Sequence, residues 1–422
     1  MSAPKTISEK ILSAKSGRDA FAGDTVVCDL DLVIGTDASS PMAIDYFERM
    51  GGTRLFDANR VVFAFDHYAP PSSAQTAAFH DRVRTFVGRH GGRLHEVGEG
   101  ISHQIAVERG EVLPGDLVVG ADSHTVTCGA LNVFAVGVGS SDLAAAMLTG
   151  KAWFRVPETI KVSLVGERAP GVAAKDAALA LVAMVGAEGA NYHAVEFHGP
   201  ALVKFTLEDR LVVSNLAVEM GAKAAIFPGD DVVAAYLAGR TTARGRPVTA
   251  DTGARYAHEI VLDISTLTPR VALPHDPENV VTIETAAGTP IHMVFIGTCT
   301  GGRVSDVHDA LAVLRRGGGR IAPGVQLVVP PASREVAERL TAEGVLDELA
   351  AMGATITTPG CGACCGTSGV IPGAGTNVLS TANRNFKSRM GPATVSIYLG
   401  APAACAAAAI AGHIVDPRDL DR

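Results

Sequence analysis

Three cysteines stand in two short glycine-framed segments, and their number and spacing suit an iron–sulfur cluster. Cys299 lies in the segment 297–303, and Cys361 and Cys364 lie in the segment 359–366. Such clusters normally take four thiolates, so three would leave one iron of a [4Fe–4S] cluster open to act as a Lewis acid. The glycines let the backbone come close and direct N–H groups at the cluster sulfurs. The segments therefore predict a metal site with these three ligands.

A pair of cysteines separated by two residues also occurs in other kinds of site, and the spacing alone does not decide among them. Three buried structural cysteines would also suit a cytosolic enzyme. Zinc would need a fourth ligand, and no His or Cys follows Cys364 at finger-like spacing. A thioredoxin-like dithiol should open a helix after a strand, whereas this pair lies in a glycine-rich segment. The adjacent Cys365 is either a spare thiol near the cluster or a packed small residue, and we favour packing.

Side chains suited to acid–base chemistry and anion binding recur in five further segments. They are 65–67 with Asp66 and His67, 100–105 with His103, 120–125 with Asp122, Ser123 and His124, 195–199 with Glu196 and His198, and 380–391 with Asn383, Arg384 and Arg389. Taken singly, each could have an ordinary structural role, such as that of a surface Asp–His pair. Arg384 and Arg389 present planar forks that match carboxylates, and their alternative is an ion pair with surface acids.

Buried strands are expected to deliver two of these segments. The apolar runs 61–65 and 116–120 are typical of strands, and Asp66 and Asp122 follow them. Catalytic side chains commonly lie at the carboxyl ends of strands in open α/β sheets. The other expected elements are helices at 74–87 and 141–149, strands at 134–139 and 159–164, a loop-bearing segment at 240–257 and a packed alanine-rich helix at 403–409.

Composition and charge narrow the class of protein. With 422 residues, 47% hydrophobic content and 46 glycines, the chain can bury a large core and form two or three α/β domains. A net charge of −8 argues against a nucleic-acid partner, which would need a concentrated basic face. The glycines at 137 and 139 lack a full dinucleotide fingerprint, so they indicate a tight turn and a helix N-cap.

Targeting and membrane signals are not evident in the sequence. The first residues lack an apolar signal region, and the alanine-rich run at 401–412 is too short for a membrane span. Seven cysteines in so long a chain do not form a secreted disulfide framework, and a reducing compartment would keep the ligands as thiolates. We therefore expect a cytoplasmic protein without membrane contact.

Taken together and in this order, the segments resemble the aconitase superfamily. The resemblance runs from about residue 25 to about residue 413, and the combination of Asp-Ser-His-Thr at 122–125 with Asn-Arg-Asn-Phe at 383–386 is highly specific. Full aconitases carry a swivelling C-terminal domain, whereas this chain stops just after the alanine-rich segment 401–413. The chain therefore looks like a separate large subunit, as in the isopropylmalate isomerase (3-isopropylmalate dehydratase) type and homoaconitase.

This resemblance implies an α/β fold with a three-domain aconitase-type core, the cluster in a central cleft and no swivelling domain. The expected domains are 1–157, 158–268 and 269–422. The resemblance further implies a [4Fe–4S] cofactor, a separate small subunit that carries the swivelling domain, and a small hydroxy-acid substrate. The proton-abstracting serine of the family lies on the swivelling domain, so no serine of this chain is expected to act as the base.

The resemblance also assigns roles to single residues. Asp66 and His67 are expected to help protonate the departing hydroxyl. A carboxylate bound to one ring nitrogen fixes the tautomer of an imidazole, and the expected pairs of this kind are Asp122 with His103 and Glu196 with His124. The remaining expected site residues are the cluster ligands Cys299, Cys361 and Cys364, then Asn383 beside the cluster, and Arg384, Arg389 and Ser123 at the substrate.

The implied reaction is the isomerisation of 3-isopropylmalate and 2-isopropylmalate by dehydration and rehydration, in leucine biosynthesis. Homoaconitase, methylmalate/citraconate hydratase and maleate hydratase activities stay open, as does a cluster-bearing regulator. The acidic balance disfavours the regulator, and an electron-transfer cluster gains nothing from an open iron. Three departures from the family pattern put the substrate and the cluster surroundings in question: Thr36 for His, Met42 for Gln, and Gly301 for the Asn after the first cysteine.

Overall fold

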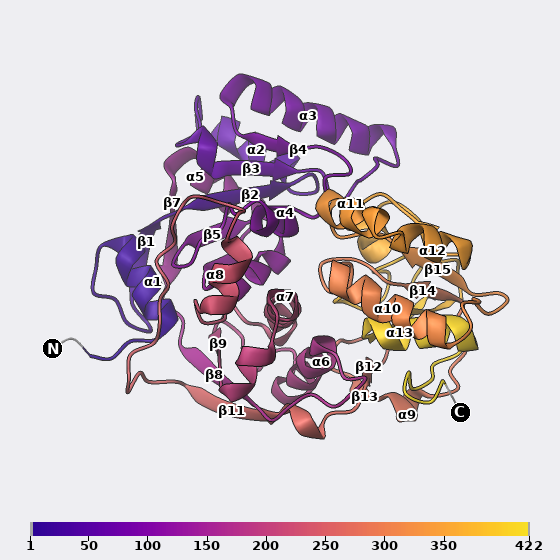
Figure 1. Ribbon diagram of the computed structural model, residues 1–422. Coiled ribbons are helices and arrows are strands. Elements are labelled where there is room, and N and C mark those ends of the chain that lie inside the picture. Colours follow the sequence, from indigo (N-terminus) through magenta and orange to yellow (C-terminus); the bar gives the residue numbers. More distant parts are fainter. Residues whose placement is uncertain (1–2, 421–422) are drawn as a thin grey trace.

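The computed structural model describes residues 3–420, in which strands and helices alternate to form four β-sheets (Figure 1). The first large sheet is parallel throughout, in the order β4-β3-β2-β5-β6. Its strands are β2 (Leu32–Thr36), β3 (Val61–Ala64), β4 (Arg93–His95), β5 (Leu117–Gly120) and β6 (Phe134–Gly137). β2, β3 and β5 are buried along their whole length, as expected for strands covered on both faces. Separately, β1 (Thr25–Asp29) and β7 (Lys151–Arg155) form an antiparallel ribbon.

Helices make the crossovers that parallel strands require. They are α2 (Ser40–Arg49) between β2 and β3, α3 (Ala74–His90) between β3 and β4, α4 (Ser102–Glu108) between β4 and β5, and α5 (Ser140–Thr149) after β6. The predicted helices at 74–87 and 141–149 are thus confirmed, as are the predicted strands at 61–65 and 116–120. Ahead of this sheet, α1 (Ile7–Ser16) begins with a capping box in which Thr6 and Glu9 bond each other's backbone N–H groups.

The second sheet is a smaller parallel sheet in the order β10-β9-β8-β11. Its elements are β8 (Thr159–Val165), α6 (Ala174–Val185), β9 (Ala194–His198), α7 (Leu207–Leu216) with the 3₁₀ turn η4 (Ala217–Met220), β10 (Ala224–Ile226), α8 (Asp231–Leu237) and β11 (His258–Asp263). β8 confirms the strand predicted at 159–164. The stretch 240–257 contains no helix or strand, in agreement with the predicted loop.

The third sheet is mixed, in the order β13-β12-β18-β17-β14-β15-β16, with only β12 antiparallel to its neighbours. Its strands are β12 (Arg270–Ala272), β13 (Val280–Thr282), β14 (Met293–Phe295), β15 (Gln326–Val329), β16 (Thr355–Ile356), β17 (Asn377–Ser380) and β18 (Ser396–Gly400). Its helices are α9 (Ile283–Ala286), α10 (Val304–Arg316), α11 (Arg334–Ala342), α12 (Val345–Ala351) and α13 (Pro402–Ala411). Most alanines of α13 are buried in the core, which confirms the predicted packed helix.

Figure 1 shows the orange-to-yellow part of the chain, with α10 to α13, beside the indigo-to-purple part that carries the first sheet. The strands of each sheet come from within one of the three ranges 1–157, 158–268 and 269–422. The division into three domains at these boundaries stays a prediction. Within residues 3–420, the structure contains no helix long and apolar enough to cross a membrane.

Candidate active site and cluster pocket

A cavity of about 150 Å³ brings together most of the residues that the sequence predicts for the site. It lies where the carboxyl ends of β2, β3 and β5 meet the cysteine segments, the edge at which α/β sheets usually bind ligands. Its lining comprises Thr36, Ala38, His67, His103, Ala121, Asp122, Ser123, His124, Thr298, Cys299, Cys361, Cys364, Asn383, Arg384 and Arg389. A larger cavity of about 790 Å³ borders α6, α7, α10 and α13, but no cysteine lines it. We therefore assign the chemistry to the smaller cavity.

The three predicted ligands are all buried at this cavity. Cys299 follows β14, whereas Cys361 and Cys364 lie at the start of and within the 3₁₀ turn η6 (Gly362–Cys365). Burial and the neighbouring thiol of Cys364 raise the pKa of Cys299 to about 12, and burial also raises the pKa of Cys361. Thiols in such surroundings become thiolates when a cation lies next to them. Three buried thiols around one cavity fit a [4Fe–4S] cluster.

Polar donors point at two of the cysteine sulfurs. Asn215 Nδ2 lies 3.1 Å and Asn383 Nδ2 lies 3.4 Å from Cys299 Sγ. Arg389 Nη2 lies 3.8 Å from Cys364 Sγ. Hydrogen bonds to the sulfurs stabilise a thiolate-held cluster and tune its reduction potential. Asn383 was predicted beside the cluster, whereas Asn215 was not predicted.

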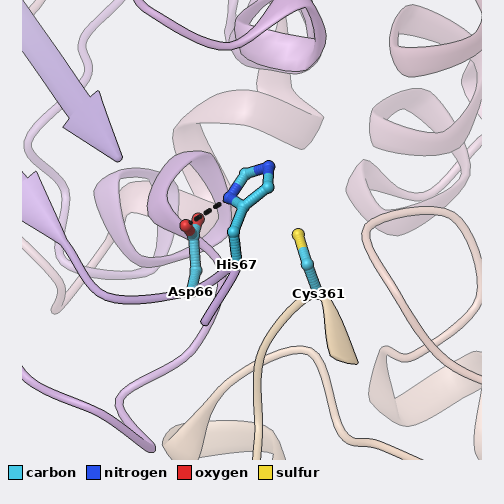
Figure 2. A group of neighbouring side chains, drawn as sticks. All are labelled: Asp66, His67 and Cys361. Carbon is cyan, nitrogen blue, oxygen red and sulfur yellow. Dashed lines mark hydrogen bonds and ion pairs between the residues drawn. The ribbon is translucent and has the colours of Figure 1, made fainter. Parts of the chain in front are cut away.

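Asp66 and His67 follow β3 and lie next to Cys361 (Figure 2). His67 Nδ1 is 2.7 Å from Asp66 Oδ1, and the Asp66, His67 and Cys361 atoms able to bind a metal lie within 4.8 Å of one another. The Cys361 N–H donates to the Asp66 carbonyl oxygen at 2.8 Å, and the Ser102 N–H donates to Asp66 Oδ2 at 2.9 Å. Although Asp66 does not line the cavity, it fixes both the imidazole and the cysteine segment.

Two histidines of the cavity have pKa values shifted in opposite directions. Burial acts against a charged His67, but the carboxylates of Asp66 and Asp122 outweigh it and raise the pKa of His67 well above its ordinary value. Burial lowers the pKa of His103 to about 3. These shifts favour the charged form of His67 and the neutral form of His103. Such a separation allows one group to give a proton while the other remains uncharged.

The predicted pair of Glu196 with His124 is wrong, because the two residues lie apart. His124 Nε2 is bonded to Glu219 Oε1 at 2.8 Å. Glu196 lies on β9, where its carboxylate accepts the Ser8 N–H at 3.1 Å and lies 3.7 Å from His198, outside the cavity lining. Glu196 therefore points toward α1 rather than toward the site.

Glu219 takes the place that the sequence analysis gave to Glu196. Arg384 Nε donates to both Glu219 carboxylate oxygens, at 2.9 and 3.0 Å. Although burial acts in the other direction, the bonds from His124 and Arg384 keep the pKa of Glu219 below its ordinary value. Asn215 and Glu219 are four residues apart, a spacing that places side chains on one face of a helix. That spacing was the available signal for both residues.

His103 also differs from its predicted arrangement. Neither of its ring nitrogens has a hydrogen-bond partner within the described part of the chain, so Asp122 acts on it only through charge. Asp122 instead caps η2 (Ser123–Leu131) by accepting the His124 N–H at 2.7 Å, and it lies 3.6 Å from His67 Nε2. His103 thus lines the cavity without a carboxylate bonded to either ring nitrogen among the described residues.

Asp37 is a further residue that the sequence analysis did not place in the site. Its carboxylate accepts the backbone N–H groups of His67 at 3.0 Å and Tyr68 at 2.8 Å, and it bonds His80 Nε2 at 3.0 Å. It follows β2, whose carboxyl end lies beside that of β3 in the parallel pair. Asp37 therefore sets the course of the backbone that presents His67.

The absence of a side chain at Gly301 has a steric cause in this chain. A Cβ atom at Gly301 would lie 2.2 Å from Thr381 Cβ. Thr381 itself is fixed, because its hydroxyl bonds the Gly297 N–H at 2.8 Å and the Gly297 carbonyl at 2.9 Å. The threonine occupies the space that a side chain at position 301 would need.

Comparison with known proteins agrees with this geometry. Residues 9–412 match the aconitase family (aconitate hydratase). The 3-isopropylmalate dehydratase large subunit 1 of Methanopyrus kandleri is 45% identical over 415 residues, which cover 98% of this chain and 99% of the relative. The 3-isopropylmalate dehydratase large subunit 2 of Archaeoglobus fulgidus is 44% identical over 418 residues, with 99% of both chains covered. Aconitase X of Thermococcus kodakaraensis, solved in its holo form, aligns with a TM-score of 0.52 and 14% identity over 90% of this chain and 88% of that chain.

These matches define the class of protein: it is an α/β hydro-lyase with an aconitase-type core and a [4Fe–4S] cofactor. The chain belongs to the aconitase family. The predicted fold class, enzyme class and cofactor are thereby confirmed, whereas the roles of single residues stay proposals. The solved structure, at its low identity, supports the fold alone.

Proposed function

We propose that this chain is the large subunit of a 3-isopropylmalate dehydratase, which interconverts 3-isopropylmalate and 2-isopropylmalate in leucine biosynthesis. The observation that carries the proposal is one cavity lined by three buried cysteines, an imidazole cluster and two arginines. The printed names of the relatives at 44–45% identity specify the same activity. In a dehydration, the leaving hydroxyl must be stabilised and a proton must be supplied to it. This set of residues offers groups for both tasks.

When bound, a [4Fe–4S] cluster with three protein ligands supplies a Lewis acid for the substrate hydroxyl. Cys299, Cys361 and Cys364 would hold it, with Asn215 and Asn383 donating to the Cys299 sulfur. These two amides also bond each other, with Asn383 Nδ2 3.1 Å from Asn215 Oδ1. The ligand thiolate is thus surrounded by donors already held in place.

The proton for the leaving hydroxyl is assigned to His67. Asp66 occupies its Nδ1, so Nε2 faces the cavity near Asp122. A carboxylate on one nitrogen fixes the tautomer and directs the other nitrogen at the reactant. His124, oriented in the same way by Glu219, is the second imidazole of the site.

Arg384 and Arg389 are assigned to the substrate carboxylates. Both line the cavity, and each has one nitrogen already engaged, with Glu219 and with Cys364 respectively. A guanidinium presents five N–H donors, so such an anchored group still has donors for an anion. Ser123, in the loop between Asp122 and His124, completes the proposed substrate contacts.

A separate small subunit is proposed as the partner, because the relatives at 44–45% identity are named large subunits. It would supply the proton-abstracting base and cover the cavity. The cytoplasmic location stays a prediction. Homoaconitase, methylmalate/citraconate hydratase and maleate hydratase remain the alternative activities, because Thr36, which lines the cavity, and Met42 differ from the family pattern.

The test is a turnover assay on anaerobically reconstituted chain mixed with its small subunit. Isopropylmalate, homocitrate, citraconate and maleate are supplied in parallel. A kcat/KM for isopropylmalate at least tenfold above that for the other acids supports the proposal. A preference for one of the other acids would reassign the substrate. Tight binding of structured RNA in a filter assay, without turnover of any acid, would favour the regulator.

A further inference from the structure

Lys175 is a buried cation held by neutral oxygen atoms. It occupies the first turn of α6 and is 2% exposed. Its ammonium donates to three neutral oxygens: Thr300 Oγ1 at 3.1 Å and the carbonyls of Thr381 and Ala382, both at 2.6 Å. Within residues 3–420 no ion pair of Lys175 is found, and the adjacent Asp176 accepts backbone N–H groups of Ala173 and Arg270 instead.

The three acceptors belong to the two segments that shape the cluster pocket. Thr300 directly follows the ligand Cys299, and Thr381 and Ala382 directly precede Asn383, whose amide donates to Cys299 Sγ. Thr300 Oγ1 also donates to the Thr381 carbonyl at 2.7 Å, so hydroxyl and ammonium meet at one oxygen. The Lys175 ammonium therefore joins the Cys299 segment to the Asn383 segment.

The position of this charge is unfavourable unless an anion lies nearby. The N-terminal turn of a helix carries partial positive charge and disfavours cations. Burial lowers the pKa of Lys175 to about 8, and the thiols of Cys405 and Cys299, the carboxylate of Asp306 and the thiol of Cys364 act in the opposite direction. Buried charges normally require a counter-charge. Three thiolates around a cluster would supply one at this place.

We propose that Lys175 is a positioning residue for the cluster, whose ammonium clamps the Cys299 and Asn383 segments together and lowers the energy of the anionic cluster they surround. Lys175 does not line the small cavity, so it does not touch the substrate; its stem borders the large cavity behind the site. It acts through Thr300 and through the backbone before Asn383. The inference rests on the cluster assignment but not on the identity of the hydroxy acid.

The test compares Lys175→Met, Lys175→Gln and the control Lys161→Met. Lys161 lies on β8 and pairs with Glu259 at the surface, away from the cysteine segments. The readouts are the cluster reduction potential by EPR-monitored titration, the rate of iron loss to a chelator, and the thermal unfolding of the cluster-free chain. Glutamine keeps two N–H donors but has no charge, whereas methionine has neither the donors nor the charge.

Both Lys175 variants should reduce at a more negative potential than the wild-type chain, because a cation beside the cluster favours the added electron. Lys175→Met should hold iron about 10–100-fold less tightly, the usual loss of metal affinity when a group that supports the ligands is removed, and should therefore lose it faster to a chelator. Lys175→Gln should lose iron more slowly than Lys175→Met. Potentials of both variants equal to that of Lys161→Met would overturn the inference. A wild-type chain that binds no cluster would instead overturn the cluster assignment, and thus the proposed function.

Discussion

Each of two imidazoles in the cavity is oriented by its own carboxylate, an arrangement that suits both for the proposed acid–base work. His67 is held by Asp66 at 2.7 Å and His124 by Glu219 at 2.8 Å. Glu219 also accepts two bonds from Arg384, so one carboxylate fixes both a histidine and an arginine of the cavity. Loss of Glu219 would therefore disturb proton transfer and substrate binding together, which a change at a purely structural acid would not do.

The first prediction compares two glutamates. Glu219→Gln should lower turnover by about 10²-fold, the lower end of the range for a positioned acid–base group, because His124 loses the carboxylate that orients it. Glu196→Gln is the matched control and should change turnover little, since Glu196 bonds Ser8 outside the cavity. Steady-state kinetics of the cluster-loaded complexes measure both. Equal losses of turnover in the two variants would show that Glu219 has no special role in the site.

The second prediction concerns the ligand set. Cys361→Ser should abolish the [4Fe–4S] cluster, because the substitution removes one of the three thiols that line the pocket and leaves too few ligands. Cys365→Ser should keep most of it, because Cys365 is not part of the cavity lining and its sulfur lies 2.9 Å from Thr367 Oγ1. Iron and sulfide analysis with EPR of reconstituted protein distinguishes the two. An intact cluster in Cys361→Ser would show that the ligand assignment is wrong.

At the scale of elements, local sequence patterns predicted the strands and helices whose formation depends on neighbouring residues in the chain. The apolar runs that became β3 and β5, and the helical periodicity of α3 and α5, carry their signals within a few residues. The strand ends then placed Asp66 and Asp122 correctly. The partner of His124 was missed because Glu219 lies 95 residues away and reaches it through the packing of η4 against η2. The four-residue spacing of Asn215 and Glu219 is visible in the sequence, but it does not identify His124 as the partner of Glu219.

The third prediction concerns the Cys299 turn. Gly301→Ala should destabilise the chain by about 1–3 kcal/mol, the usual cost of overpacking, because its Cβ would meet the Thr381 side chain. Gly88→Ala is the control: this glycine of α3 has open space around it, so alanine should stabilise the helix by about 0.5–1 kcal/mol. Thermal unfolding of both variants measures the difference. A Gly301→Ala chain as stable as wild type would mean that Thr381 moves aside freely.

On the scale of the whole molecule, an acidic chain gathers several cationic side chains at and near the site. The chain carries a net charge of −8, yet Arg384 and Arg389 line the small cavity, and Lys175 is buried close behind it. Arg303 is also fully buried, and its Nε donates to Gln104 Oε1 at 2.9 Å. Composition argued against a basic nucleic-acid face but gave no sign of this internal cation cluster. Its members come from separate parts of the chain, so only folding brings them together.

The last prediction concerns the complete enzyme. The isolated chain should fold and hold its cluster yet show negligible dehydratase activity, because the proposed base and one wall of the cavity belong to the small subunit. Water in an open cavity would also weaken the attraction of Arg384 and Arg389 for carboxylates by raising the local dielectric. Titration with the small subunit should raise turnover to saturation at a fixed stoichiometry, while the cluster-free Cys361→Ser chain should stay inactive at every ratio. Full turnover by the purified chain, with the partner shown absent by mass spectrometry, would contradict the two-subunit proposal.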